Sequence, residues 1–113
     1  MPGTMELVAD PMRREILRRI WETELPVNSL VDTFDVSQPA ISFHLRVLRE
    51  GGLVRVRQQG TQRYYRAVPE AFGELRFYLE VYWQDRLSRL KDEAELEARR
   101  NRRVRQLRSH AAD

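Results

Sequence analysis

Arginine is concentrated in the middle of this 113-residue chain, where it far outnumbers the acidic residues. Residues 36 to 67 hold six arginines and one acid, Glu50, which leaves a local excess of positive charge. The arginines are Arg46, Arg49, Arg55, Arg57, Arg63 and Arg66. Guanidinium groups gathered in one segment bind phosphate oxygens, so this distribution indicates a polyanionic partner more clearly than the formal net charge of +3 does.

Chemistry other than charge recognition is poorly supported by the residue types present. The chain has no cysteine, and its two histidines, His44 and His110, are too far apart to pair within one helix. It has no glycine-rich phosphate loop, and neither histidine has a credible catalytic partner. The carboxylates over 70–85 suit a solvated helix face, because transition-metal sensors favour histidine or thiolate ligands. We therefore expect no enzyme, no metal site and no cofactor.

The composition limits the class of protein further. With 42% hydrophobic and 33% charged residues, the chain suits one folded domain with little room for a second core. No apolar run is long enough to span a bilayer, and the first 15 residues lack the apolar core of a signal peptide. The sequence therefore predicts no membrane partner and a location in the cytoplasm.

Three helices are expected ahead of residue 51. Asp10-Pro11 opens the first, because aspartate caps free N–H groups and proline is preset for the first helical position. A break at 25–26 separates it from a second, shorter helix. A tight turn at 35–37 leads into a third helix, which Ser37 caps and a glycine pair ends. Two helices joined by a three-residue turn predict a helix-turn-helix over 26–50.

The pattern changes after residue 52. Apolar and arginine side chains alternate over 53–68 around a turn at Gln59-Gly60-Thr61, which is typical of a two-stranded hairpin. Helical spacing returns over 70–98, where apolar residues recur at steps of three and four. The arginine-rich end, 99–113, has few apolar anchors. We expect it to be frayed or disordered, outside a folded domain of residues 1–95.

The third helix has an exposed side that suits base edges. By helical projection Ile41, Leu45 and Leu48 define a buried side, and the opposite side is mostly polar. The predicted recognition residues are Ser37, Gln38, Pro39, Ser42, Phe43 and Arg46. Phe43 suits either a thymine methyl or deoxyribose contact, slightly favoured by its polar neighbours, or a stray exposed aromatic. His44 flanks the buried side, which favours a hydrogen-bonded structural histidine.

The hairpin after this helix carries arginine at alternating positions. We expect these side chains to converge on its tip and to contact the DNA backbone or the adjacent minor groove. The predicted wing contacts are Arg55, Arg57, Gln59, Thr61 and Arg63. The alternative is a solvated edge whose charges discourage strand pairing. The helix-turn-helix directly before the hairpin favours the DNA contact.

Four segments resemble the ArsR/SmtB family of bacterial repressors: LVADPMRREIL at 7–17, VSQPAISFHLRVL at 36–48, GGLV at 51–54 and GTQRYY at 60–65. The resemblance implies a mainly α winged helix-turn-helix with a small β-hairpin, in the order helix-helix-helix-helix-strand-strand-helix, with a long C-terminal dimerisation helix. It also implies a homodimeric repressor on a pseudo-palindromic operator in double-stranded DNA. The groove contacts carried over are Gln38, Pro39, Ser42 and Phe43.

The family pattern and the apolar stripe of the last helix together suggest a dimer interface. The predicted interface residues are Met5, Leu75, Leu79, Tyr82, Trp83 and Leu87. The cysteine motif of arsenic and cadmium sensors and the Asp/His pairs of zinc and nickel sensors are both absent, so no family metal site carries over. Asp35 stands at a turn position often held by glycine, where aspartate tolerates the left-handed conformation.

Three alternatives stay open from the sequence. The aromatic group Phe72, Phe77, Tyr78, Tyr82 and Trp83 suits a dimer core, which its large area favours, or a pocket for an unidentified small-molecule inducer. The six arginines over 99–108 suit a solvated helix end, a secondary phosphate contact or a protein-binding segment. The alternative function is a winged-helix protein-interaction module without specific DNA recognition.

Overall fold

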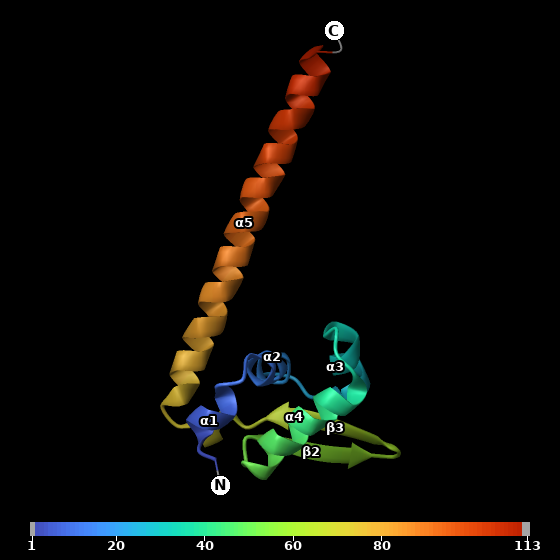
Figure 1. The fold of residues 1–113 in the computed structure, drawn as a ribbon, viewed down its shortest axis with the longest axis vertical. Helices are drawn as coiled ribbons and strands as arrows, with labels where there is room; N and C mark the ends of the chain where they lie inside the picture. The colour runs from blue at the N-terminus through green and yellow to red at the C-terminus, as the bar shows by residue number, and fades with distance from the viewer. Residues whose placement is uncertain (1, 112–113) are drawn as a thin grey trace. The chain divides into compact units, whose positions relative to one another are not determined.

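The computed structural model describes residues 2–111, and the side chains of residues 2–108. Its elements are α1 (Thr4–Val8), α2 (Pro11–Arg19), β1 (Leu25–Pro26), α3 (Val27–Thr33), α4 (Gln38–Glu50), β2 (Val54–Gln59), β3 (Gln62–Ala67), the 3₁₀ helix η1 (Pro69–Phe72) and α5 (Leu75–Ala111) (Figure 1). The chain divides after Arg76 into two units, which are described separately. The order of helices and hairpin confirms the predicted winged helix-turn-helix.

The start of α2 follows the local sequence signals. The Asp10 carboxylate accepts hydrogen bonds from the backbone N–H groups of Met12 and Arg13, at 2.8 and 3.1 Å, and Pro11 occupies the first helical position. The guanidinium of Arg14 donates to the carbonyls of Val8 and Ala9 at the end of α1, at 2.8 and 2.9 Å. The last carbonyl groups of a helix have no partner within that helix, so these bonds to Arg14 satisfy them and connect the short α1 to α2.

Both ends of α4 are fixed by local hydrogen bonds. The Ser37 hydroxyl accepts from the backbone N–H of Ala40 at 3.3 Å. At the other end Leu53 N–H donates to Leu48 and Gly52 N–H donates to Arg49, which is the Schellman arrangement, and Gly52 has the required positive φ of 78°. The turn before α4 differs from expectation. Among the described residues only glycines have positive φ, so Asp35 does not use the left-handed conformation.

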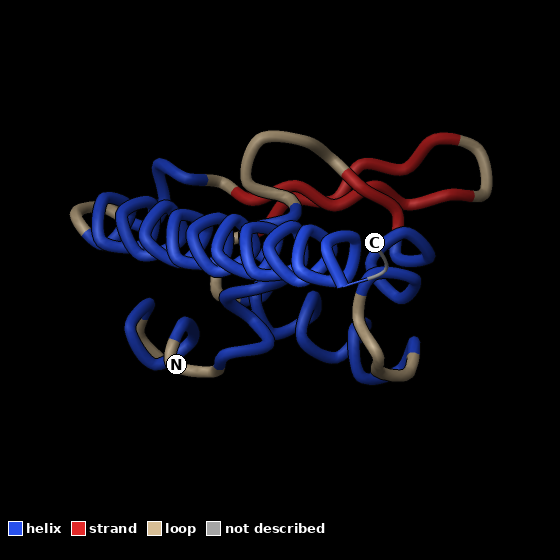
Figure 2. Tube along the Cα trace, turned by 90° about the horizontal axis from the view of Figure 1, so that it is seen from above, coloured by secondary structure: helices blue, strands red, loops and turns tan. Residues whose placement is uncertain are grey.

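The wing is a hairpin of β2 and β3, and a third strand that the sequence did not predict completes the sheet. The strand order is β1-β3-β2, with every pair antiparallel. Gly60, at φ 63°, begins the two-residue turn between Gln59 and Gln62. β1 has only two residues, and its Pro26 is tolerated because β1 is an edge strand. Figure 2 shows the strands along one side of the helices of this unit.

The core of the first unit is formed by aliphatic side chains from α2, α3, α4 and the start of β2. The largest fully buried side chains are Ile16, Leu17, Ile20, Leu30, Ile41, Leu45, Leu48 and Leu53. Burial of each such side chain stabilises the fold by about 1.5–3 kcal/mol relative to exposure. Phe72 packs its ring 4.9 Å from that of Trp21, so it belongs to this core rather than to a separate aromatic pocket.

The predicted last helix differs at both of its ends. It does not begin at residue 70, because η1 ends at Phe72 and is followed by Gly73, whose φ of 57° is incompatible with a continuous right-handed helix. It also continues beyond residue 98, since α5 runs as one helix through the predicted frayed tail to Ala111, while residues 112 and 113 lie outside the described part (Figure 1). Within the described part, no helix is long and apolar enough to cross a membrane.

Candidate nucleic-acid interface

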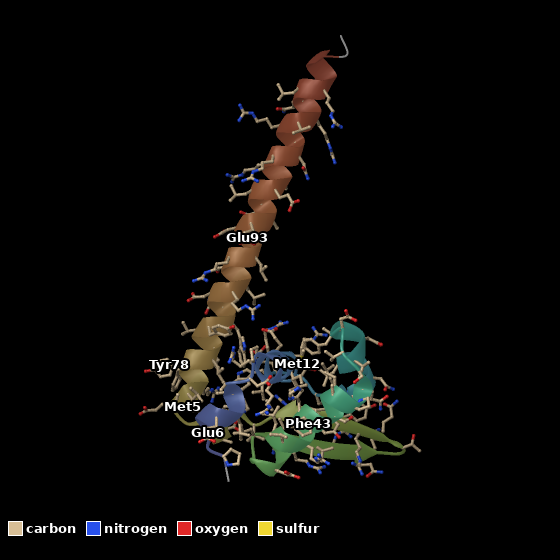
Figure 3. All side chains as sticks on the ribbon, in the orientation of Figure 1. Met5, Glu6, Met12, Phe43, Tyr78 and Glu93 are labelled. Atoms are coloured by element: carbon tan, nitrogen blue, oxygen red, sulfur yellow. The ribbon has the colours of Figure 1, made fainter. Side chains whose placement is uncertain are left out.

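The exposed side of α4 carries the predicted recognition residues. Its buried side consists of Ile41, Leu45 and Leu48, with exposed fractions of 0, 1 and 0%. Gln38, Pro39, Ser42, Phe43 and Arg46 are all exposed. Phe43, labelled in Figure 3, remains 48% exposed. The Arg46 guanidinium lies 5.8 Å from the centre of its ring. α4 is therefore anchored by one side and presents an aromatic ring with polar neighbours on the other.

Two residues at the margins of this surface have structural partners. Ser37 caps α4, so its hydroxyl is already used as an acceptor within the chain. The Nδ1 atom of His44 accepts a hydrogen bond of 3.3 Å from Nε of Arg13, and a second Arg13 nitrogen donates to the carbonyl of Leu7. Burial is the main cause that lowers the pKa of His44. The hydrogen bond expected for His44 is present, and it ties α4 to α2.

The wing arginines do not converge as the sequence suggested. Residues directly opposite on paired strands share a face, and the register pairs Gln58 with Arg63 and Arg57 with Tyr64. Arg63 thus lies on the face turned toward α4. Arg55 pairs with Arg66, and both lie with Arg57 on the opposite face. The prediction of one arginine cluster at the tip was wrong, because alternation along the two strands separates the side chains.

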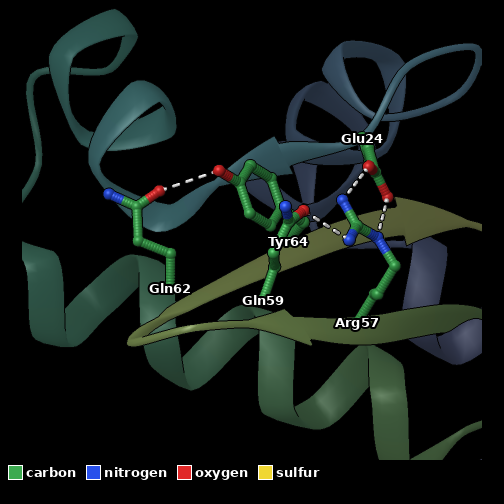
Figure 4. A network of polar contacts seen from close by, with 5 residues as sticks. All are labelled: Glu24, Arg57, Gln59, Gln62 and Tyr64. Carbon is green, nitrogen blue, oxygen red and sulfur yellow. Dashed lines mark hydrogen bonds and ion pairs between the residues drawn. The ribbon is translucent and has the colours of Figure 1, made fainter.

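Arg57 is held by a network on that opposite face (Figure 4). Its Nε donates to a carboxylate oxygen of Glu24 at 3.2 Å, a terminal nitrogen forms an ion pair with the other oxygen, and the second terminal nitrogen donates to Gln59 at 2.7 Å. The guanidinium also lies 5.0 Å from the ring centre of Tyr64, whose hydroxyl donates to Gln62. The hydrogen bond with Arg57 lowers the pKa of Glu24 and raises that of Arg57.

A hollow of about 440 Å³ lies between α4 and β3. Its lining residues are Pro39, Ser42, Phe43, Arg46 and Arg49 from α4, with Arg63 and Tyr65 from β3. We call this surface the arginine hollow. It joins predicted recognition residues to one predicted wing residue. Arg49 and Tyr65 were not among the predicted contact residues. Only the packing of β3 beside α4 brings them to this surface.

The tip of the wing contributes to a second, smaller hollow. Thr61 lines it together with residues at the start of α3, and its volume is about 220 Å³. Gln59, also at the tip, is bound to Arg57. Contacts of Arg55, Gln59 and Thr61 with DNA stay predictions.

The predicted dimer residues have mixed exposure. Met5, Tyr82 and Leu87 are exposed, at 72, 37 and 56%, whereas Leu79 and Trp83 are buried and Leu75 is half-buried. Three further side chains of α5 are more exposed than the sequence indicated. They are Phe77 at 64%, Tyr78 at 73% and Val81 at 58%. Phe77 and Tyr78 belong to the aromatic group for which a dimer core was favoured, whereas Val81 was in neither that group nor the predicted interface.

No group of three or more His, Cys, Asp or Glu residues within the described part is arranged to hold a metal ion. The side chain of His110 falls outside that part. The carboxylates over 70–85, for which a solvated helix face was expected, belong to no such group.

Comparison with known proteins gives related regulators. A family model described as a helix-turn-helix domain matches residues 8–57. The HTH-type transcriptional regulator Rv2034 of Mycobacterium tuberculosis is 38% identical over 78 residues, which cover 69% of this chain and 73% of that protein. A crystal structure of a candidate transcriptional regulator for arsenical resistance has 40% identity and a TM-score of 0.63, and covers 82% of this chain and 97% of its own.

A third relative has a winged helix-turn-helix structure solved by NMR. It is a homodimeric DNA-binding domain from Mycobacterium bovis, described as a candidate ArsR-family regulator, with 28% identity and a TM-score of 0.61. The alignment covers 71% of this chain and 74% of that one. The residues matched by the family model, 8–57, include α4 and the first strand of the wing as far as Arg57. The chain is a DNA-binding transcriptional regulator of the ArsR family.

Proposed function

We propose that this protein is a homodimeric repressor that reads a pseudo-palindromic operator with α4 in the major groove. The proposal rests on the two sides of α4. The side formed by Ile41, Leu45 and Leu48 is fully buried, and this burial fixes the rotation of α4 about its own axis. The opposite side is exposed along its whole length. A helix fixed in this way presents the same few side chains to every duplex, which sequence recognition requires.

Gln38 and Phe43 are the side chains best suited to distinguish base pairs. An exposed glutamine amide can donate to and accept from adenine, and an aromatic ring can contact a thymine methyl group. Gln38 occupies the first turn of α4, where helix N-termini approach base edges in this class of protein. Pro39 and Ser42 stand beside them on the exposed side, and we assign them to the same contact.

Dimerisation supplies the second half-site contact. α5 exposes several large apolar side chains, among them Phe77, Tyr78, Val81, Leu87 and Leu90. Exposed apolar side chains at this density mark an interaction surface. The homodimeric relative supports a second copy as the occupant. In the first unit, Met5 on α1 is likewise exposed and is assigned to the interface.

Repression follows from occupancy, because a dimer bound across a promoter excludes other proteins from the same DNA. No catalytic step is needed, and the protein acts in the cytoplasm, where bacterial DNA lies. Release from the operator requires a signal. The proposed signal is a small-molecule inducer of unidentified chemistry.

The test is selection of bound duplexes from a random pool, followed by affinity measurements on the selected sequence. Gln38→Ala should lose about 1–3 kcal/mol of discrimination at one base pair. Gln84→Ala, on α5, is the control and should change no base preference. A wild-type protein that binds promoter DNA without salt dependence, or that selects no sequence, would show that the winged helix serves another purpose, such as protein contact. A concentration-independent monomer mass in light scattering would contradict the dimer.

A further inference from the structure

We propose that the arginine hollow binds one phosphodiester group of the DNA backbone, and that Arg49 is a phosphate contact together with Arg46 and Arg63. This inference rests on the proposed function and adds to it, because it assigns a role to Arg49 and Tyr65 and separates the wing arginines into two classes. The proposed contact fixes the position of the wing on the DNA backbone and does not recognise bases.

The charge of the hollow is not neutralised by any side chain that the structure describes. Three guanidinium groups line it, and no carboxylate does. Within residues 2–108, none of the three arginines forms an ion pair, unlike Arg18 with Glu15 and Arg57 with Glu24. All three are exposed. Unpaired arginines held on two elements form a site of high positive potential, and a phosphate group brought there exchanges counterions for guanidinium contacts.

The shape and lining of the hollow suit a nucleotide backbone better than a compact anion. About 440 Å³ exceeds the volume that one phosphate group needs, and the rings of Phe43 and Tyr65 supply apolar wall beside the arginines. A deoxyribose presents an apolar surface that can contact these rings, and the phosphate beside it presents the negative charge that can contact the arginines. Guanidinium forks bind two phosphate oxygens at once, which lysine cannot do.

The position of the hollow makes it continuous with the recognition surface. Ser42 and Phe43 line the hollow and also belong to the exposed side of α4 assigned to base contact. When a duplex lies against α4, its sugar–phosphate backbone therefore passes next to the hollow. Arg63 approaches from β3, the central strand of the sheet, which is hydrogen-bonded on both sides. The hollow thus sets the spacing between α4 and the wing along the backbone.

The experiment compares two arginines that line the hollow with one on the opposite face of the wing. Arg49→Ala and Arg63→Ala are made in the full chain, with Arg66→Ala as the control, because Arg66 lies on the same strand as Arg63 but on the opposite face. Affinity is measured against salt on a selected duplex and on a random-sequence duplex. Because one neutralised phosphate contributes about 0.9 to the slope of log K against log salt, Arg49→Ala and Arg63→Ala should each remove part of that 0.9 on both duplexes, whereas Arg66→Ala should leave the slope unchanged.

Two further arms identify the ligand chemistry. Arg49→Lys should keep the slope but lose several-fold in affinity, since the charge stays and the fork is lost. A duplex with a neutral methylphosphonate at the contacted position should bind wild type more weakly, and Arg49→Ala should lose nothing more on it. Unchanged thermal unfolding of each variant by circular dichroism shows that the fold is intact.

The outcomes separate the two proposals. If wild type shows salt-dependent binding but Arg49→Ala keeps the full slope, or if Arg66→Ala flattens it equally, the hollow is not a phosphate site. If Arg49→Ala abolishes binding of inorganic phosphate and leaves DNA binding unchanged, the site takes a free anion and the assignment to DNA is overturned. If wild type binds no duplex, it is the proposed function that fails.

Discussion

The two faces of the wing differ both in arginine content and in the partners of their arginines, with Arg63 on the face toward α4 and Arg55, Arg57 and Arg66 on the other. On the face toward α4, Arg63 is unpaired among the described residues and joins Arg46 and Arg49. On the other face, Arg57 is bound to Glu24 and Gln59 and stacked near Tyr64. Residue type alone does not distinguish these arginines. Strand alternation decides which side chain meets a carboxylate and which is left for phosphate.

The largest expected difference between the faces is in stability. Tyr65 is buried, with 9% of its surface exposed, whereas Tyr64 is half-buried and bonded at the surface. Tyr65→Ala should lower the free energy of unfolding by about 3 kcal/mol, because it leaves a cavity against the core. Tyr64→Ala should cost less than half as much. Urea unfolding followed by circular dichroism measures both, and equal losses would mean that the two faces are packed alike.

The next effect is a gain of DNA affinity on one face only. Gln58 lies opposite Arg63 on the α4 side, and Gln62 lies on the other side. Gln58→Arg should strengthen DNA binding several-fold at low salt and steepen the salt slope, offset in part by repulsion from Arg63. Gln62→Arg should leave the slope unchanged. A steeper slope for Gln62→Arg would place both faces against the duplex and break the comparison.

A smaller effect is expected from the carboxylate that holds Arg57. Glu24→Gln removes the ion pair and leaves Arg57 charged but free. If that face is turned away from DNA, the salt slope should not change, while amide hydrogen exchange at Arg57 and Tyr64 should become faster as the network loosens. Stronger non-specific binding by Glu24→Gln would instead show that Glu24 masks a DNA contact.

The smallest effect is a pH dependence from the same pair. The hydrogen bond with Arg57 lowers the pKa of Glu24, so the pair stabilises the fold above the ordinary glutamate pKa of about 4.3. That contribution is lost as the pH falls through the lowered pKa. The stability difference between wild type and Glu24→Gln should therefore be greatest near neutral pH and should shrink in acid. Thermal unfolding across this range measures it, and a difference independent of pH would argue against the pair.

Much of the fold could be predicted because its signals are local. Asp10, Ser37 and Gly52 fix helix ends through bonds to residues no more than three positions away, and these positions were identified correctly. The break at Gly73 was missed, because a glycine within an apolar pattern does not reveal its φ. The two residues of β1 were missed as well. So short a strand has no periodicity of its own and exists only by pairing with β3.

The arginine-rich segment that first indicated a polyanionic partner shows where sequence information ends. The sequence by itself determined the winged helix-turn-helix, the family and the two sides of α4, since these depend on residue type and on periods of 3.6 and 2. Only the tertiary structure decided that Glu24 meets Arg57, 33 positions away, and that Arg49 lies beside Arg63. Contacts between distant residues depend on how the elements pack, and packing assigned identical side chains to different partners.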